Sequence, residues 1–441
     1  MDPELGLVTV EPGVTQGQLA EYLDARNLPY LVPVTGAGPD ASLLGNVLER
    51  GYGITPYPDH FAAVTSLEAV LPDGSLYTPT LAAAGCERAD RAYRWGLGPY
   101  LNGLFTQFGL GIVTQVTLAL APRPERVEAF FFSLPRGADL GSAAARLRDL
   151  LRRCGSTVSA LNLMNARRIL SMFEPYPTAR VPDGGTMPQA LVDELMSPYG
   201  KASWLGVGCL YGTHRTVRAA KAEIRRLLHG WSSRPWFVTP AQACTARKWA
   251  ERLPLLKNSG FARRLQRLDE TLRIMNGRPS SVALRLAYWR SRHAPDAHVH
   301  MNPSRDGSGL LWYSPLVPLG AADLDSFAAF VERTCLAHGI EPLITLTTLS
   351  DRCCDSTIPL LFRRDDPAEA ERAHACYEAL LKQGLVLGFP PYRLPVHAMP
   401  LMVKSAQTCW RMSRSIKQAL DPQNIMAPGR YDSELFPQGE A

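Results

Sequence analysis

The chain has 441 residues, 46% of them hydrophobic and 20% charged, and its formal net charge is +6 at pH 7. These values are ordinary for a soluble globular enzyme of two or three domains. The small charge, which comes partly from basic runs at 146–153 and 263–267 with helical apolar spacing, does not predict nucleic-acid binding because no recognition motif accompanies it.

The nine cysteines show no CxxC spacing, and the adjacent pair Cys353 and Cys354 is poorly placed for a metal site. A long chain with this usage is expected in a reducing compartment, which favours a cytoplasmic protein. No apolar run approaches the ~20 residues of a membrane span, and no signal peptide is visible. Neither a membrane nor a disulfide framework is therefore expected, and a homo-oligomer is left open.

The first ~125 residues are predicted to be rich in strands. Residues 5–28 predict a strand, a turn and a helix, in which Thr15 and Gln18 have capping-box spacing. Residues 66–79 predict a β-hairpin that reverses at Pro72–Gly74. A further strand follows near 111–120, with these residues expected on one face: Ile112, Val116, Leu118 and Leu120.

The middle of the chain alternates helices and strands. Helical patterns lie near 140–154, 215–229, 323–338 and 366–383. In the last of these, Asp366 suits the N-cap and Gly384 suits the end. Apolar runs between the helices predict strands, so we expect an α+β domain, a sheet with helices on one side. The final 50 residues return to loops and one short helix.

Several familiar motifs are absent from the sequence. It contains no GxGxxG after a strand, no GxxxxGK[ST] and no GxSxG, which argues against a Rossmann site, a P-loop and a serine hydrolase. His298 and His300 alternate in a way that can chelate a metal, but no third ligand is evident, so an exposed strand is the better interpretation and no metal is predicted.

Three constellations carry possible chemistry. Gly45, Gly51 and Gly53 can let the backbone approach a flat or phosphorylated ligand, or can make a tight structural loop. Asp59 before His60, in a stiff proline-rich loop, can act as a base or simply bind the backbone. Tyr392 beside Arg393 can hold an anionic oxygen such as a phenolate, or can lie in a loop at a domain boundary.

These pieces occur together, and in the same order, in a known family. The chain resembles the flavoprotein oxidases and dehydrogenases typified by vanillyl-alcohol oxidase and 4-cresol methylhydroxylase. The matching stretches are TVEPGVTQGQL, LLGNVLERGYGITPYPDH, VLPDGSLYTP, WGLGPYLNGLFTQFGLGIVT, PYR at 391–393 and DPQNIMAPGRY. They extend from residue 9 to residue 431, so the resemblance covers essentially the whole chain.

The resemblance implies an α+β fold with a PCMH-type FAD-binding domain and a cap domain, whose antiparallel sheet is flanked by helices. The expected boundaries are 1–125 for the FAD-binding part, 126–388 for the cap and 389–441 for a segment that returns to the active site. It also implies the cofactor FAD and the transfer of hydride from the benzylic carbon of a para-substituted phenol to flavin N5. The electron acceptor would be oxygen or a cytochrome.

The resemblance also assigns roles to individual residues. Asp59 matches the acidic residue near flavin N5, Tyr392 and Arg393 match the pair that holds the phenolate, and Arg393 also offsets charge on the reduced flavin. Arg430 matches a basic residue near the active site. The residues matching flavin contacts are Gly45, Asn46, Glu49, Arg50, Gly51, Gly53, Gly111, Ile112 and Val113.

The chain departs from the family pattern at three places. Leu310 stands where some members carry a histidine that tethers FAD, and the loop before it has no tyrosine, so non-covalent FAD is expected. CCDST at 353–357 replaces a pair of histidines, so substrate preference is expected to differ. Roughly a hundred family residues before TVEPGV have no counterpart. A late start, a separate chain, or a catalytically impaired remnant acting as a scaffold or partner subunit would each account for this.

Overall fold

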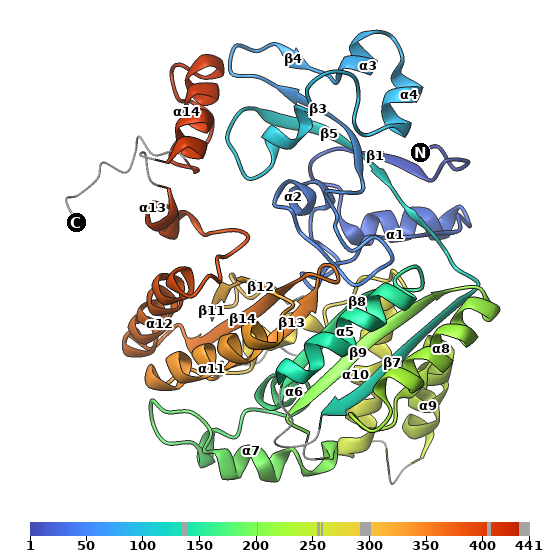
Figure 1. Cartoon of the computed structure of the whole chain (residues 1–441), viewed down its shortest axis with the longest axis vertical. Helices are drawn as coiled ribbons and strands as arrows, with labels where there is room; N and C mark the ends of the chain where they lie inside the picture. Colours follow the sequence, from blue (N-terminus) through green and yellow to red (C-terminus); the bar gives the residue numbers. More distant parts are fainter. Residues whose placement is uncertain are drawn as a thin grey trace.

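The computed structural model describes residues 1–134, 140–200, 202–253, 256, 259–291, 301–403 and 407–431. A smaller sheet built from the N-terminal residues lies at one end of the molecule, and a larger sheet with its helices lies at the other (Figure 1). The N-terminus lies beside the smaller sheet (Figure 1). His298 and His300 lie outside the described residues, so the structure does not test their pairing.

The smaller sheet is antiparallel, with the order β1-β5-β3-β4. The expected capping box is confirmed, since Thr15 Oγ1 accepts from the Gln18 backbone N–H while the Gln18 side chain accepts from the Thr15 N–H. The expected hairpin is also confirmed by β3 and β4. The elements of this part are β1 (Leu7–Val10), α1 (Gln16–Ala25), β2 (Tyr30–Leu31), α2 (Leu43–Leu48), β3 (Val64–Val70), β4 (Leu76–Tyr77), α3 (Thr80–Ala83), α4 (Glu87–Ala92), β5 (Ile112–Ala119) and β6 (Ala121–Pro122).

The strand β5 corrects one expectation about which face its residues share. Val116 and Leu118 are buried as expected, but Ile112 is 59% exposed whereas its neighbour Val113 is buried. The pairing of β5 with β3 shifts register between Glu68 and Ala69, which is the signature of a β-bulge. The extra residue on β5 reverses which side chains face inward at the start of the strand, so Val113 is buried in place of Ile112.

The larger sheet has eight strands. Seven follow the order β10-β7-β9-β8-β13-β14-β11, and the eighth, β12, pairs with β14. All its pairings are antiparallel. The elements of this part are β7 (Arg126–Leu134), α5 (Leu140–Cys154), β8 (Val158–Asn165), α6 (Ala166–Phe173), α7 (Gln189–Leu195), β9 (Trp204–Gly212), α8 (His214–Leu228), β10 (Trp236–Val238), α9 (Pro240–Arg252), α10 (Gly260–Met275), β11 (Ser308–Tyr313), β12 (Leu316–Pro318), α11 (Ala321–Ala337), β13 (Thr345–Thr348), β14 (Cys353–Arg363) and α12 (Pro367–Val386).

Helices cover both faces of this sheet, which corrects the expectation of helices on one side. One face packs against α5, α8, α11 and α12, around buried Phe130 and Leu161 (Figure 1). The opposite face meets α9 and α10 through a separate cluster that includes Val207, Leu272 and Met275. Strand side chains alternate between faces, so the sheet has two apolar sides and needs helices on each.

The helix α12 begins as predicted and ends later than predicted. Asp366 Oδ1 accepts hydrogen bonds from the backbone N–H groups of residues 368 and 369, which confirms the N-cap. Gly384, however, lies inside the helix, and a Cβ there would meet the Tyr313 hydroxyl oxygen at 2.1 Å. The glycine therefore makes room for a buried tyrosine. The left-handed residue after the helix is Gly388, with φ of 86°.

The C-terminal segment, with α13 (Met399–Met402) and α14 (Thr408–Leu420), returns to the smaller sheet (Figure 1). Buried Lys417 anchors it, because its Nζ donates to the carbonyl oxygens of Gly109 and Met426 at 2.6 and 2.5 Å. The same ammonium pairs with buried Asp421 at 2.5 Å. Within the described part of the chain, no helix is long and apolar enough to cross a membrane.

Candidate functional site

The glycine-rich loop, residues 51–60, folds back on itself as a short two-stranded ladder. The Gly53 N–H donates to the Pro58 carbonyl at 2.9 Å, and the His60 N–H donates to the Gly51 carbonyl at 3.2 Å. Between these two bonds Tyr52 faces Asp59. Gly53 is required by packing, because a Cβ there would lie 2.3 Å from the Val34 carbonyl oxygen. Directly opposed residues of such a ladder project to the same side, so Tyr52 and Asp59 share a face.

His60 is buried behind this ladder and holds it to α2. Its Nδ1 lies 2.5 Å from the Asn46 Oδ1, and burial lowers its pKa to about 4 although Asp59 acts in the opposite direction. The imidazole is therefore neutral at pH 7, and Nδ1 must carry the hydrogen that the Asn46 oxygen accepts. The other nitrogen, Nε2, has no hydrogen-bond partner among the described residues. Asn46, predicted as a cofactor contact, thus also positions the loop.

Asp59, the predicted acid beside the flavin, is exposed and lies at the start of a turn. Its Oδ1 accepts a hydrogen bond from the Ala62 N–H at 2.9 Å. That contact leaves the second carboxylate oxygen available to a ligand on the face it shares with Tyr52. Both earlier interpretations of this residue, a backbone contact and a reacting carboxylate, therefore fit its geometry.

Tyr52 joins this loop to the larger sheet through Asp355. Its hydroxyl donates a hydrogen bond to Asp355 Oδ2, which also accepts from the Thr357 hydroxyl at 3.1 Å. Burial raises the pKa of Asp355 to about 7, against the opposing effects of Thr357 and Arg393. Asp355 Oδ1 has no partner in the described part of the chain. A buried carboxyl with one free oxygen and a pKa near neutrality can take up or release a proton.

The predicted phenolate pair lies next to this contact. The rings of Tyr52 and Tyr392 meet edge to face, with centroids 5.7 Å apart. Burial raises the pKa of Tyr392 although Arg393 acts to lower it, so the phenol stays protonated at neutral pH. The Arg393 guanidinium carbon lies 5.2 Å from the Tyr392 ring centroid. Tyr392 can therefore donate a hydrogen bond, and Arg393 supplies positive charge beside it.

Glu49 and Arg430 meet at the same place from opposite ends of the sequence. The Arg430 Nη2 donates to Glu49 Oε1. Gln107 closes the group, because its Nε2 donates to the carbonyl oxygens of Glu49 at 3.2 Å and Tyr392 at 3.3 Å. The structure thus brings together four residues predicted from three separate motifs, namely Glu49, Tyr392, Arg393 and Arg430.

The other predicted cofactor contacts lie around this group. Gly45 is in α2, capped by Ser42, whose hydroxyl oxygen accepts from the Gly45 N–H at 3.1 Å. Arg50 has φ of 51° and directs its exposed guanidinium to the Thr106 hydroxyl at 2.8 Å. Ile112 and Val113 begin β5, and Gly111 directly precedes it, where a Cβ would lie 2.7 Å from the Val70 carbonyl oxygen. The exposed Ile112 side chain is free to cover a ligand.

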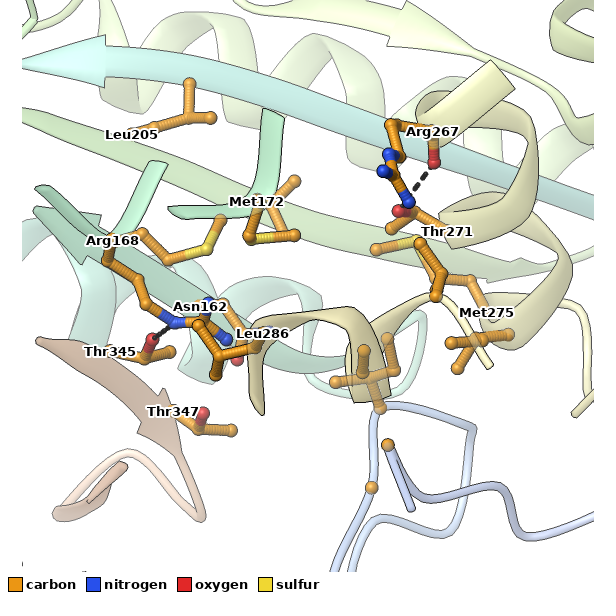
Figure 2. A pocket seen from close by; sticks show the side chains of 18 of the residues that line it. Asn162, Arg168, Met172, Leu205, Arg267, Thr271, Met275, Leu286, Thr345 and Thr347 are labelled. Carbon is orange, nitrogen blue, oxygen red and sulfur yellow. Dashed lines mark hydrogen bonds between the residues drawn. The ribbon is translucent and has the colours of Figure 1, made fainter. Parts of the chain in front are cut away.

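A cavity of about 250 Å³ lies between part of the glycine-rich loop and the larger sheet. Its lining includes Tyr52, Gly53 and Ile54 of the loop. Asn162, Arg168, Thr345 and Thr347 also line it (Figure 2). Much of its remaining wall is apolar, from strands β7 to β9 and helix α10. Small-molecule sites have this composition, an apolar wall with a few convergent polar groups.

These residues fit a flavin. Buried polar atoms near the loop that lack partners in the described chain include His60 Nε2, Asp355 Oδ1 and Asn162 Oδ1. Buried polar groups are rarely left unpaired, and the ring of a flavin has both hydrogen-bond donors and acceptors. The loop backbone, Asn46 and the Glu49–Arg430 pair would hold the cofactor.

Sequence reasoning missed three residues of the site: Tyr52, Asp355 and Arg168. Asp355 had a visible signal, since an acid within the apolar strand run 353–362 must be buried and so calls for a partner. Tyr52 lies in the glycine-rich loop, but its hydrogen-bond partner is 303 residues away in sequence. Arg168 sits in a helix of ordinary amphipathic pattern, and only the fold places it at the cavity.

Comparison with known proteins gives a consistent result. A profile of the FAD binding domain family matches residues 1–79. The chain is 33% identical over 435 residues to a 1'-carboxy-chondrochloren decarboxylase from Chondromyces crocatus, covering 97% of this chain and 79% of that relative. It is 27% identical over 443 residues to a 4-cresol dehydrogenase [hydroxylating] flavoprotein subunit from Pseudomonas putida, covering 99% and 77%.

Two solved structures share the fold. A p-cresol methylhydroxylase with substrate bound superposes with a TM-score of 0.83 at 24% identity, covering 99% of this chain and 78% of that one. A 4-ethylphenol oxidase from Gulosibacter chungangensis, in complex with isoeugenol, gives a TM-score of 0.83 at 20% identity, covering 98% and 77%. The whole described chain therefore follows one known architecture.

Proposed function

Because the chain belongs to the PCMH-type family of FAD-linked oxidases, we propose that it oxidises the benzylic carbon of para-substituted phenols. FAD is its cofactor, and its class is that of an FAD-dependent oxidoreductase. The observation that carries the proposal is the group formed by Tyr52, Asp355, Tyr392 and Arg393 beside the glycine-rich loop. A phenol is the substrate that such a group binds best.

Tyr392 and Arg393 hold the substrate oxygen. The protonated Tyr392 hydroxyl donates a hydrogen bond to it, and Arg393 offsets the negative charge of its phenolate form. A phenolate donates electrons through the ring to the para carbon, so hydride leaves that carbon more easily. The residues therefore act by stabilising charge that develops as the reaction proceeds.

When bound, FAD supplies the hydride acceptor. Asp59 lies on the same side of the loop ladder as Tyr52, so it is the carboxylate available to the reacting edge. Asp355, with a pKa raised to about 7 by burial, exchanges a proton with the substrate through Tyr52. Leu310 offers no atom for a covalent link, so the cofactor is held without one. The proposed final electron acceptor is oxygen or a cytochrome.

A second candidate reaction couples the same hydride loss to decarboxylation. The observation that favours it is the 33% identity, over 97% of the chain, to a protein named a decarboxylase. Hydride leaves the benzylic carbon, the bond to a carboxylate on the next carbon breaks, and its electron pair forms a side-chain double bond as CO₂ departs. The same residues hold the phenolic end in both reactions.

The test is product analysis with the purified chain and FAD. 4-Ethylphenol is expected to bleach the visible flavin band under anaerobic conditions and to yield 1-(4-hydroxyphenyl)ethanol, or 4-vinylphenol, with an electron acceptor present. A protein that remains colourless with FAD would instead support the alternative of a non-enzymatic remnant acting as a scaffold or partner subunit. A flavin that stays oxidised with every para-alkylphenol would refute the proposed substrate class.

A further inference from the structure

The cavity beside the glycine-rich loop has an unusual charge distribution. Three arginines line it, Arg168, Arg267 and Arg285, and none of its described lining residues is an aspartate or a glutamate. Arg168 comes from α6, Arg267 from α10, and Arg285 from the short 3₁₀ turn 283–288. Buried charges are usually paired with an opposite charge. This cavity therefore offers positive charge to a ligand.

Arg168 has neutral partners only. Its Nε donates to the Thr345 hydroxyl at 3.0 Å, and its Nη1 donates to the Ser171 hydroxyl at 3.2 Å. No described carboxylate forms an ion pair with it, and burial lowers its pKa to about 10, so it remains charged at neutral pH. Its side chain reaches along the cavity wall toward Thr345 (Figure 2).

The neighbouring Arg167, in contrast, forms an ordinary structural ion pair. Arg167, one residue earlier, is buried and pairs with Glu341 at 2.5 Å. The same helix therefore carries one arginine neutralised by the protein and one that is not. A buried guanidinium with neutral partners is costly unless an anion joins it, so an anion that enters from the cavity would compensate that cost.

Arg267 and Arg285 add to this charge. A single carboxylate serves both, because Glu270 lies 3.9 Å from Arg267 Nη1 and 3.7 Å from Arg285 Nη2. Arg267 Nη1 and Arg285 Nε have no hydrogen-bond partner within the described chain. Burial and the charge of Arg285 lower the pKa of Arg267. The two groups therefore have unused capacity to attract an anion.

The larger sheet connects the arginine-lined cavity to the residues proposed to bind the phenol. Asn162, Thr347 and Asp355 are direct cross-strand neighbours on β8, β13 and β14. Neighbouring strands are ~4.8 Å apart, so two strand steps span about 10 Å. Asn162 and Thr347 line the cavity, whereas Asp355 binds Tyr52. A substrate with its phenol ring at the Asp355 end of this row and a short acidic side chain at the Asn162 end would match that length.

We propose that the para side chain of the phenolic substrate carries a carboxylate, and that Arg168 is its direct partner in this cavity. The inference rests on the proposed function, because it places the phenolic end of the substrate at Tyr392 and Arg393. Arg267 and Arg285 attract the anion without contacting it. The preferred substrates are accordingly 4-hydroxyphenyl alkanoic acids, and neutral alkylphenols bind more weakly.

The experiment compares 3-(4-hydroxyphenyl)propanoate with 4-propylphenol in the FAD-loaded chain. Anaerobic stopped-flow reduction gives the dissociation constant and the limiting rate for each, and calorimetry gives the affinity without turnover. Arg168→Gln is expected to weaken binding of the acid by about 10- to 100-fold, the loss of one buried charge-assisted contact, and to leave 4-propylphenol unchanged. Arg168→Lys, which keeps the charge, should retain part of the affinity.

Arg263→Gln is the matched control, because Arg263 is exposed on α10 and its loss changes net charge equally. It should affect neither compound. Tighter binding of 4-propylphenol by the parent chain, or an equal effect of Arg168→Gln on both compounds, would overturn the inference. A loss of FAD affinity in Arg168→Gln would also overturn it, since the anion would then be a cofactor phosphate. If neither compound reduces the flavin, the proposed function fails, while calorimetry still decides the carboxylate site.

Discussion

The hydroxyl of Tyr52 donates a hydrogen bond to Asp355, which joins the glycine-rich loop to the larger sheet across 303 residues of sequence. Tyr52 stands opposite Asp59 in the loop ladder and packs on Tyr392. One tyrosine therefore connects the proposed flavin side, the proposed phenolate pair and a buried acid. The predictions below test what each of these residues does.

Asp355 makes stability depend on pH. Its pKa in the folded protein, about 7, lies above the unfolded value near 3.8, so the folded state holds a proton that the unfolded state has released. Stability is then fully present below the unfolded pKa and falls as pH rises through the folded pKa. The loss amounts to at most about 4 kcal/mol. Denaturant unfolding at pH 5 and pH 8 should show a smaller drop in Asp355→Asn than in the parent chain.

The exposed Asp365 gives the control for this measurement. Asp365→Asn should keep the pH dependence of the parent. The assignment fails if Asp355→Asn and the parent lose the same stability between the two pH values.

Asp59→Asn should slow flavin reduction by orders of magnitude, because it removes a negative charge next to the reacting edge. The amide oxygen can still accept from the Ala62 N–H, so the turn is expected to survive. Stopped-flow reduction measures the rate, and Asp73→Asn, in the exposed turn of the hairpin, provides a control with the same change of charge. Equal rates in Asp59→Asn and the parent chain would remove Asp59 from the chemistry.

Arg393→Ala should weaken phenol binding by about 10- to 100-fold, since a charge-assisted contact is lost. The effect should be largest at pH values below the pKa of the free phenol, about 10, where binding itself must favour the phenolate. Binding titrations across this pH range provide the measurement. A loss that is the same at every pH would mean that Arg393 only packs against Tyr392.

Lys417→Met should detach the C-terminal segment from the N-terminal sheet. The change leaves Asp421 buried without its partner and costs about 3–5 kcal/mol of unfolding free energy. Lys382→Met is the matched control, because its ion pair with Glu378 has the same i,i+4 spacing but is exposed, and such pairs contribute about 0–1 kcal/mol. Similar losses in the two variants would show that Lys417 does not anchor the segment.

Local features of the fold could be predicted from sequence, because they depend on a few adjacent residues. The caps at Thr15 and Asp366 and the hairpin at 66–79 belong to this class. Gly384 could not be interpreted correctly, since the tyrosine it accommodates comes from strand β11, far from helix α12 in sequence. The position of Asp59 in a loop followed from its prolines, but the Tyr52–Asp355 contact and the unpaired charge of Arg168 depend on distant strands.

The most direct test of the central claim is anaerobic reduction of the FAD-loaded chain by 4-ethylphenol, compared with its methyl ether, 4-ethylanisole. The two compounds have the same para side chain, but only the phenol can become a phenolate beside Tyr392 and Arg393. The account predicts that the phenol reduces the flavin and that the ether leaves it oxidised. Equal reduction by both compounds, or none by the phenol, would contradict it.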